Sequence, residues 1–251
     1  KGEESYQEFI EAAISRAHIP LKVVLGRSII TVNDYINMTK GDIIKLDKKV
    51  DDEDNVFLDE RLLLTPSFAI TECQNLTQKM AIIAKKNFFR SLKMLNNFSE
   101  KRMEKIQRKE PVIDMYEDKL GTFLVNLSTK NLADSDSREV SKLLYSISDL
   151  ERIGDHAINI LKVAKELHEK NIALSEYVKS ELHVIMEALS EIMEITIEAF
   201  CENNMEKAKK VEPLEQIIDI LVSNARDSHV SRLQNGQCTL EQGFIYSEIL
   251  T

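Results

Sequence analysis

Residues that break helices are scarce in this sequence, which has only 7 glycines and 4 prolines among 251 residues. From Thr65 onward, apolar residues recur at helical spacing with few interruptions, which predicts long α-helices. Short polar loops join them, an arrangement typical of antiparallel bundles. We place the helices at 66–97, 99–127, 135–169, 175–203 and 205–234, with another starting near 240, and assign Ser99, Ser135 and Ser175 as N-caps.

Cysteine is also rare, and long apolar runs are missing. Cys73, Cys201 and Cys238 are far apart and form neither a CxxC pair nor a zinc-ligand spacing, so we expect reduced thiols. A helix needs about 20 apolar residues to cross a bilayer. The best candidate, at 184–200, is interrupted by four glutamates, and KGEESYQEF at the start does not resemble a signal peptide. These absences predict a soluble, cytoplasmic protein.

Basic residues are fewer than acidic residues, with 33 Lys and Arg against 42 Asp and Glu. This balance argues against nucleic-acid binding as the main function. The sequence has no glycine-rich P-loop and no GxSxG nucleophile motif. We therefore expect neither a nucleic-acid partner nor an enzyme.

Residues 1–58 differ in kind from the rest. They are rich in Val, Ile and Thr and are punctuated by LGR and TKGD, a pattern typical of short strands and turns. We expect a small, partial β segment with strands at 20–25, 28–32, 43–46 and 55–58.

The helical part, 59–251, contains a repeat. EPVIDMYEDKL begins at Glu110 and EQIIDILVSNA begins at Glu215, an offset of 105 residues. Each stretch lies on the second helix of a predicted three-helix unit. The fold class that follows is mostly α, with tandem three-helix bundles at 66–170 and 175–251.

The stretch SDLERIGDHAINI, at 148–160, carries an unusual set of charges for an amphipathic helix. Glu151 and Asp155 are four residues apart, so they share a helix face and repel each other by a few tenths of a kcal/mol. Gly154, between them, lowers helix propensity by roughly 1 kcal/mol relative to Ala. Close approach of a neighbouring backbone, or a cation, would compensate for both costs.

Two further carboxylate pairs, Glu110/Asp114 and Glu215/Asp219, occupy matching places in the repeat. If neighbouring helices pack side by side, Glu110 and Asp114 converge with Glu151 and Asp155. Carboxylate oxygens suit a divalent or trivalent metal ion such as Mg²⁺, Mn²⁺, iron, Zn²⁺ or Ca²⁺.

Arg152 and His156 would neutralise or orient such ligands as outer partners. Two other interpretations stay open, because acidic pairs at this spacing are common by chance in so acidic a chain. One is an internal network between arginine and the carboxylates, and the other is a solvated helix face.

The helical part resembles the PhoU family, in particular the PhoU-like domain of bacterial sodium/phosphate cotransporters. DLERIGDHA at 149–157 is similar to the signature helix of that family, and FLDERLLLTPSFAI at 57–70 to the junction before it. The resemblance, over 57–251, implies paired three-helix bundles whose acidic motifs bind metal. It also implies a regulatory role in phosphate uptake, with a membrane phosphate transporter or its regulator as partner. By the repeat offset, the counterpart of Glu151 would fall near position 256, so we expect the second bundle to be truncated.

Residues 1–58 resemble the SpoA-type domain of flagellar motor switch proteins. IPLKVVLGRSIITVNDYINMTKGDIIKLDKKVDD, at 19–52, carries the VxLGR strand and the GDIIKLD turn of that domain. This resemblance implies intertwined dimers and flagellar rotor proteins as partners. The alternative function is therefore a flagellar switch scaffold. Either resemblance is compatible with a homo-oligomer at the inner face of the membrane.

Overall fold

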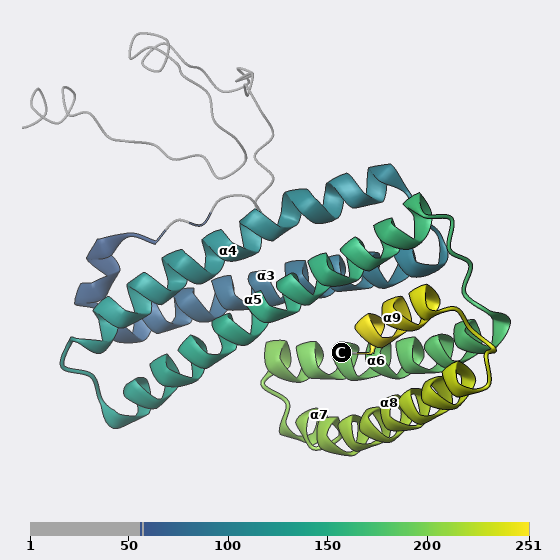
Figure 1. The fold of residues 1–251 in the computed structure, drawn as a ribbon. Coiled ribbons are helices and arrows are strands. Elements are labelled where there is room, and N and C mark those ends of the chain that lie inside the picture. Colours follow the sequence, from purple (N-terminus) through teal and green to yellow (C-terminus); the bar gives the residue numbers. More distant parts are fainter. Residues whose placement is uncertain (1–55, 57, 251) are drawn as a thin grey trace, which may run out of the picture. The chain divides into compact units, whose positions relative to one another are not determined.

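The computed structural model describes Val56 and residues 58–250, which belong to one compact unit (Figure 1). These residues are mostly helical, as the apolar spacing predicts. In chain order the elements are the 3-10 helix η2 (Glu60–Leu64) and the α-helices α3 (Pro66–Asn96), α4 (Glu100–Ser128), α5 (Asp134–Glu169), α6 (Glu176–Glu202), α7 (Met205–Ala208), α8 (Val211–Gln234) and α9 (Leu240–Ile249).

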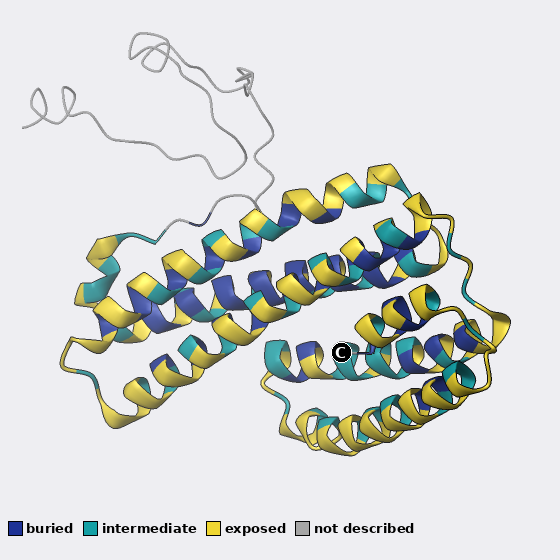
Figure 2. Cartoon of the chain, in the orientation of Figure 1, coloured by how far each residue is buried: buried dark blue, intermediate teal, exposed yellow. Residues whose placement is uncertain are grey.

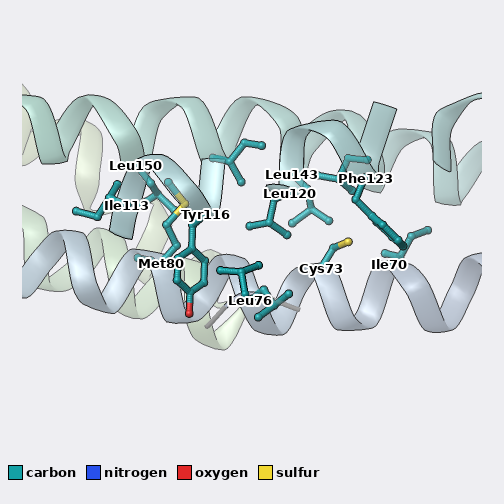
Figure 3. Close-up of a cluster of buried hydrophobic side chains, with 14 of the residues drawn as sticks. Ile70, Cys73, Leu76, Met80, Ile113, Tyr116, Leu120, Phe123, Leu143 and Leu150 are labelled. Carbon is teal, nitrogen blue, oxygen red and sulfur yellow. The ribbon is translucent and has the colours of Figure 1, made fainter. Parts of the chain in front are cut away.

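Helices α3, α4 and α5 pack along one another and form the first bundle (Figure 1). Their apolar stripes meet in the core drawn in Figure 3. Met80 of α3 and Ile113 and Leu120 of α4 have no exposed surface, and Leu143 and Leu150 of α5 pack against the same core. Complete burial of each such side chain contributes about 1.5–3 kcal/mol, so this core is a large source of stability.

Helices α6, α8 and α9 form the second bundle, which has a smaller core. Of the 24 residues of α8, only Ala225 and His229 are buried. Figure 2 shows the same contrast, because α8 is mostly exposed whereas α3 carries a continuous buried stripe. The core residues of the second bundle are Val178, Leu182, Ile185, Ala225, Tyr246 and Leu250.

The predicted helix starts are partly right. Pro66 is the first residue of α3, a position where its missing N–H has no intrahelical partner to lose. Ser175 caps α6, since its Oγ accepts a hydrogen bond from the N–H of Val178 at 3.3 Å. Ser99 occupies the N-cap position of α4 but makes no side-chain capping bond. The assignment of Ser135 is wrong, because α5 already begins at Asp134.

The single helix predicted at 205–234 is also wrong, because the structure divides it into α7 and α8. Asn204 starts α7 by accepting hydrogen bonds from the N–H groups of Glu206 and Lys207. Pro213 contributes to the break, although α4 continues across Pro111. In a continuous helix the ring of Pro213 would clash with the carbonyl of Lys209, so the chain turns at 209–210 and Pro213 falls in the first turn of α8.

The predicted strands at 20–25, 28–32 and 43–46 lie outside the described residues, and the partial β segment stays a prediction. Of the strand predicted at 55–58, Val56 and Leu58 are described and neither is in a strand. Among the helices of the described part, none has the length and apolar character that spanning a membrane requires.

Candidate metal-binding carboxylates

Gly154 of α5 lies in close contact with Ile113 of α4. A Cβ atom added to Gly154 would lie 3.1 Å from Cδ1 and 3.3 Å from Cγ2 of Ile113. The structure therefore shows the close approach of an isoleucine side chain at this glycine, where the sequence predicted a neighbouring backbone or a cation. On α4, Glu110 and Asp114 flank Ile113, and on α5 Glu151 and Asp155 flank Gly154. The helix contact thus lies between the two carboxylate pairs.

The two pairs interact electrostatically across this contact. Partial burial raises the pKa of Glu110, and the nearby carboxylates of Asp114 and Asp155 raise it further. The Lys162 ammonium acts in the opposite direction, as the weakest of these influences. The structure therefore brings a carboxylate of α5 within interaction range of the α4 pair.

Glu151 shows the same convergence from the other helix. Partial burial raises its pKa first, followed by the charge of Asp155 on its own helix and those of Glu117 and Asp114 on α4. Glu110 and Glu151 are half-buried, whereas Asp114 and Asp155 are exposed. The described residues contain no group of three His, Cys, Asp or Glu side chains arranged to hold one ion. The carboxylates are therefore close enough to repel but do not surround a common point.

The two predicted outer partners, Arg152 and His156, are both exposed. The Arg152 Nη1 lies 3.9 Å from Oδ1 of Asp149, and both side chains are about 70% exposed (69% and 72%). Arg152 thus pairs with Asp149 on its own helix.

The third pair, Glu215 and Asp219, is exposed on α8. Helix α8 contacts α6, α7 and α9 in the second bundle. In the first bundle α5 supplies the second carboxylate pair, but α9 ends at Ile249 and is only ten residues long. A metal site at Glu215 and Asp219 stays a prediction.

Two features of the structure are missing from the sequence predictions. The first is Glu117, whose carboxylate contributes to the raised pKa of Glu151. Its spacing from Glu110 and Asp114 places it on the same face of α4, so helical periodicity could have identified it.

The second is a polar network in the second bundle, which no local pattern indicates. Arg232 donates to both carboxylate oxygens of Glu181 at 2.8 Å, and the Tyr246 hydroxyl donates to Oε2 of Glu181 at 2.7 Å. Burial alone would raise the pKa of Glu181, but the hydrogen bonds from Arg232 and Tyr246 outweigh it and lower the pKa. The network joins one residue each of α6, α8 and α9, and these residues are 14 or more positions apart in the sequence.

Comparison with known families confirms both resemblances. Residues 77–164 match the model of the PhoU domain, and residues 12–65 match the model described as type III flagellar switch regulator (C-ring) FliN C-term. The PhoU match includes α4 and most of α5, and so all four carboxylates of the first bundle. The flagellar match falls mostly outside the described residues.

One curated relative is the phosphate-specific transport system accessory protein PhoU homolog of Clostridium acetobutylicum. The two chains are 26% identical over 146 residues, which are 57% of this chain and 65% of the relative. The match thus spans less than two thirds of that protein. No solved structure matches the chain.

Proposed function

We propose that residues 59–251 act as a PhoU-like accessory and regulatory module of a phosphate transport system, with a non-catalytic role. The observation that carries the proposal is the PhoU domain match over 77–164 together with the carboxylates that α4 and α5 bring together inside that span. The partner would be a membrane phosphate transporter or its regulator, met at the inner face of the membrane. The name of the Clostridium acetobutylicum relative, a phosphate-specific transport system accessory protein, supports the proposed role in phosphate transport.

We further propose that Glu110, Asp114, Glu151 and Asp155 hold a divalent or trivalent metal ion. Carboxylate oxygens fit Mg²⁺, Mn²⁺ or iron in donor chemistry. Partial burial is the main cause of the raised pKa values of Glu110 and Glu151, and repulsion from the neighbouring carboxylates adds to it. A bound cation would relieve that repulsion. Because the oxygens do not yet surround one point, metal binding would require rotamer changes in these half-buried and exposed side chains.

Metal content after purification without chelator tests the metal proposal. We expect a bound divalent or trivalent metal in the wild-type chain and its loss in the variant Glu151→Gln plus Asp155→Asn. A matched control is Glu212→Gln plus Asp227→Asn, which removes the same charge from exposed positions of α8. Equal metal content in all three proteins would contradict the proposal.

Phosphate uptake tests the regulatory role. In bacteria that lack their own PhoU homologue, expression of this chain should alter the rate of phosphate uptake, and the carboxylate variant should lose that effect. The α8 control variant should keep it. An unaltered uptake rate with soluble, folded protein would contradict the regulatory proposal, whatever the metal content.

A second candidate function is supported by the flagellar switch match over 12–65. In that case the chain would act as a scaffold that binds flagellar rotor proteins. Co-purification with a rotor protein, abolished by deletion of residues 1–58, would support this function. Retention of the rotor protein after that deletion would contradict it.

Measuring the molar mass of the intact chain tests the expected homo-oligomer.

A further inference from the structure

The second half of α3 and the first part of α4 carry an excess of positive charge. Residues 79–109 contain ten Lys or Arg and two Glu, whereas the whole chain has 33 basic and 42 acidic residues. The excess therefore belongs to one segment of an otherwise acidic chain. Six of these basic residues form two short stripes, which together we call the basic face: Lys86, Arg90 and Lys93 of α3 and Lys101, Lys105 and Arg108 of α4.

The two stripes lie at the same level of the α3–α4 hairpin. Within each stripe the residues follow one another at steps of four and three, so they share one side of their helix. Asn87 Nδ2 donates a hydrogen bond to the carbonyl oxygen of Ile106 at 3.2 Å. Asn87 adjoins the α3 stripe and Ile106 lies within the α4 stripe, so this buried bond holds the two stripes beside each other.

Both stripes lie on the side of the hairpin opposite α5. Phe88 of α3 packs with Ala157 of α5, and the first two residues of the α3 stripe lie two positions before and after Phe88, about 200° around the helix. Glu110 of α4 interacts with Asp155 of α5, and the α4 stripe lies about 140–180° around α4 from Glu110. The basic face is thus a single surface built from two helices.

Most of this charge has no carboxylate partner. All members of the basic face are exposed except Arg90, which is half-buried. Within the described residues, Arg90, Lys93 and the α4 stripe form no ion pair. Basic residues elsewhere do, since Lys170 pairs with two glutamates and so does Lys207. These five positive charges are therefore not neutralised by the part of the chain that the structure describes.

The surroundings of the basic face narrow the choice of partner. Toward α6 it ends at a groove of about 670 Å³, where Lys93 faces a helix that contributes three glutamates to the lining. Among the described residues of 79–109, the only large apolar side chain that is exposed is Ile82, at 39%. A tight protein–protein interface depends on buried aromatic or apolar anchors. The surface instead fits a partner that presents negative charge over a wide area.

We propose that the basic face docks on the anionic phospholipid headgroups of a membrane surface. Each Lys or Arg held near such a surface strengthens binding about fivefold, without any apolar anchor. The acidic remainder of the chain does not prevent docking, because at physiological salt a charge is screened beyond about 8 Å. This inference goes beyond the proposed role in phosphate transport and does not depend on it.

Co-sedimentation with lipid vesicles tests the proposal. The full 251-residue chain is used, with a chelator present so that no metal can bridge carboxylates to headgroups. One vesicle preparation is phosphatidylcholine alone, and the other is equal parts phosphatidylcholine and phosphatidylglycerol. We expect the anionic vesicles to bind the chain at least about tenfold more tightly than the neutral ones, with weaker binding as salt is added.

A triple variant locates the surface. Lys101→Gln plus Lys105→Gln plus Arg108→Gln removes the charge of the α4 stripe at three exposed positions. It should weaken binding to the anionic vesicles at least about tenfold. Circular dichroism verifies that the variant is folded.

A matched control removes the same number and kind of charges elsewhere. Lys130→Gln plus Arg138→Gln plus Lys142→Gln changes exposed positions in the α4–α5 loop and at the start of α5. Because these residues lie outside the basic face, binding to the anionic vesicles should change less than about twofold.

Three outcomes would overturn the proposal. One is equal affinity for neutral and anionic vesicles, and another is equal loss of binding in the two triple variants. The third is a chain that does not bind anionic vesicles but binds polyglutamate or a DNA duplex through the α4 stripe, since an acidic protein or a nucleic acid would then be the partner. None of these outcomes bears on metal content or phosphate uptake.

Discussion

The two bundles carry the same pattern of apolar residues but bury it to different extents. In the first bundle the stripe of α4 is covered along its whole length by α3 and α5. In the second, the matching stripe of α8 is buried only at Ala225 and His229. A shared pattern therefore predicts which face of a helix turns inward, but the degree of burial depends on the third helix.

The largest expected effect on stability comes from truncating the isoleucine at equivalent positions of α4 and α8, Ile113 and Ile218. Ile113→Ala removes a side chain without exposed surface, so it should lower the free energy of unfolding by about 2–5 kcal/mol. Ile218→Ala removes a half-buried side chain and should cost less than about 1 kcal/mol. Urea unfolding followed by circular dichroism measures both. Equal losses would mean that the two stripes are equally covered.

The polar network of the second bundle should give the next largest effect. Glu181→Gln weakens charged hydrogen bonds to a largely buried Arg232 and should cost about 2 kcal/mol at pH 7. Glu187→Gln, at a 70% exposed side chain of the same helix, is the control and should change little.

The stability difference between wild type and Glu181→Gln should depend on pH. The pKa of Glu181 is lowered from its ordinary value of 4.5, so its contribution is present above pH 4.5 and is lost as pH falls through the lower, folded-state value. The stability gap between wild type and Glu181→Gln should therefore narrow below pH 4.5. A gap that widened on acidification would contradict the assigned network.

The tight helix contact of the first bundle can be tested with glycine substitutions. Gly121→Ala should stabilise the protein by about 1 kcal/mol, because its new Cβ would meet Ile147 at an ordinary 3.7 Å. Gly154→Ala should gain nothing or destabilise, because its Cβ would lie 3.1 Å from Ile113. In the Ile113→Ala background, Gly154→Ala should become stabilising. Thermal unfolding of the single and double variants measures this coupling, and additive effects would count against the close contact.

The smallest effect concerns the carboxylates between α4 and α5. Partial burial, and after it repulsion from neighbouring carboxylates, raises the pKa values of Glu110 and Glu151, so the cost of ionising these groups in the folded protein appears as pH rises above 4.5 and is absent well below it. The variant Glu110→Gln plus Glu151→Gln should be more stable than wild type by a few tenths of a kcal/mol at pH 7 and not at pH 3. Urea midpoints in the presence of chelator provide the measurement. A less stable variant at pH 7 would show that these carboxylates attract a partner group.

The sequence predicts most of the helices because their stripes are long and regular. The bounds of α3, α4, α5 and α6 agree with the predicted ranges within about two residues. The errors fall where local chemistry competes with periodicity. Pro213 divides a helix whose apolar pattern continues across it, and α5 begins at Asp134 without the serine cap expected there.

The candidate site is predictable only to the level of which residues share a helix face. Spacing identifies Glu110/Asp114 and Glu151/Asp155 as pairs, and the same spacing extends to Glu117. Which pairs meet depends on the packing of α4 against α5, set by Ile113 and Gly154. The network of Glu181, Arg232 and Tyr246 carries no local signal, because its members are 14 or more residues apart.

By itself, the sequence determined which segments are helical, where most of the loops between them lie, and that one acidic motif recurs after 105 residues. These properties follow from backbone preferences and from the 3.6-residue period, which act over a few turns at a time. Only the tertiary structure decided that the pair Glu110/Asp114 comes within interaction range of Asp155 on α5. The matching pair in the repeat, Glu215/Asp219, lies exposed on α8. Burial and charge repulsion depend on what lies across the helix interface, and no property of a single helix specifies that.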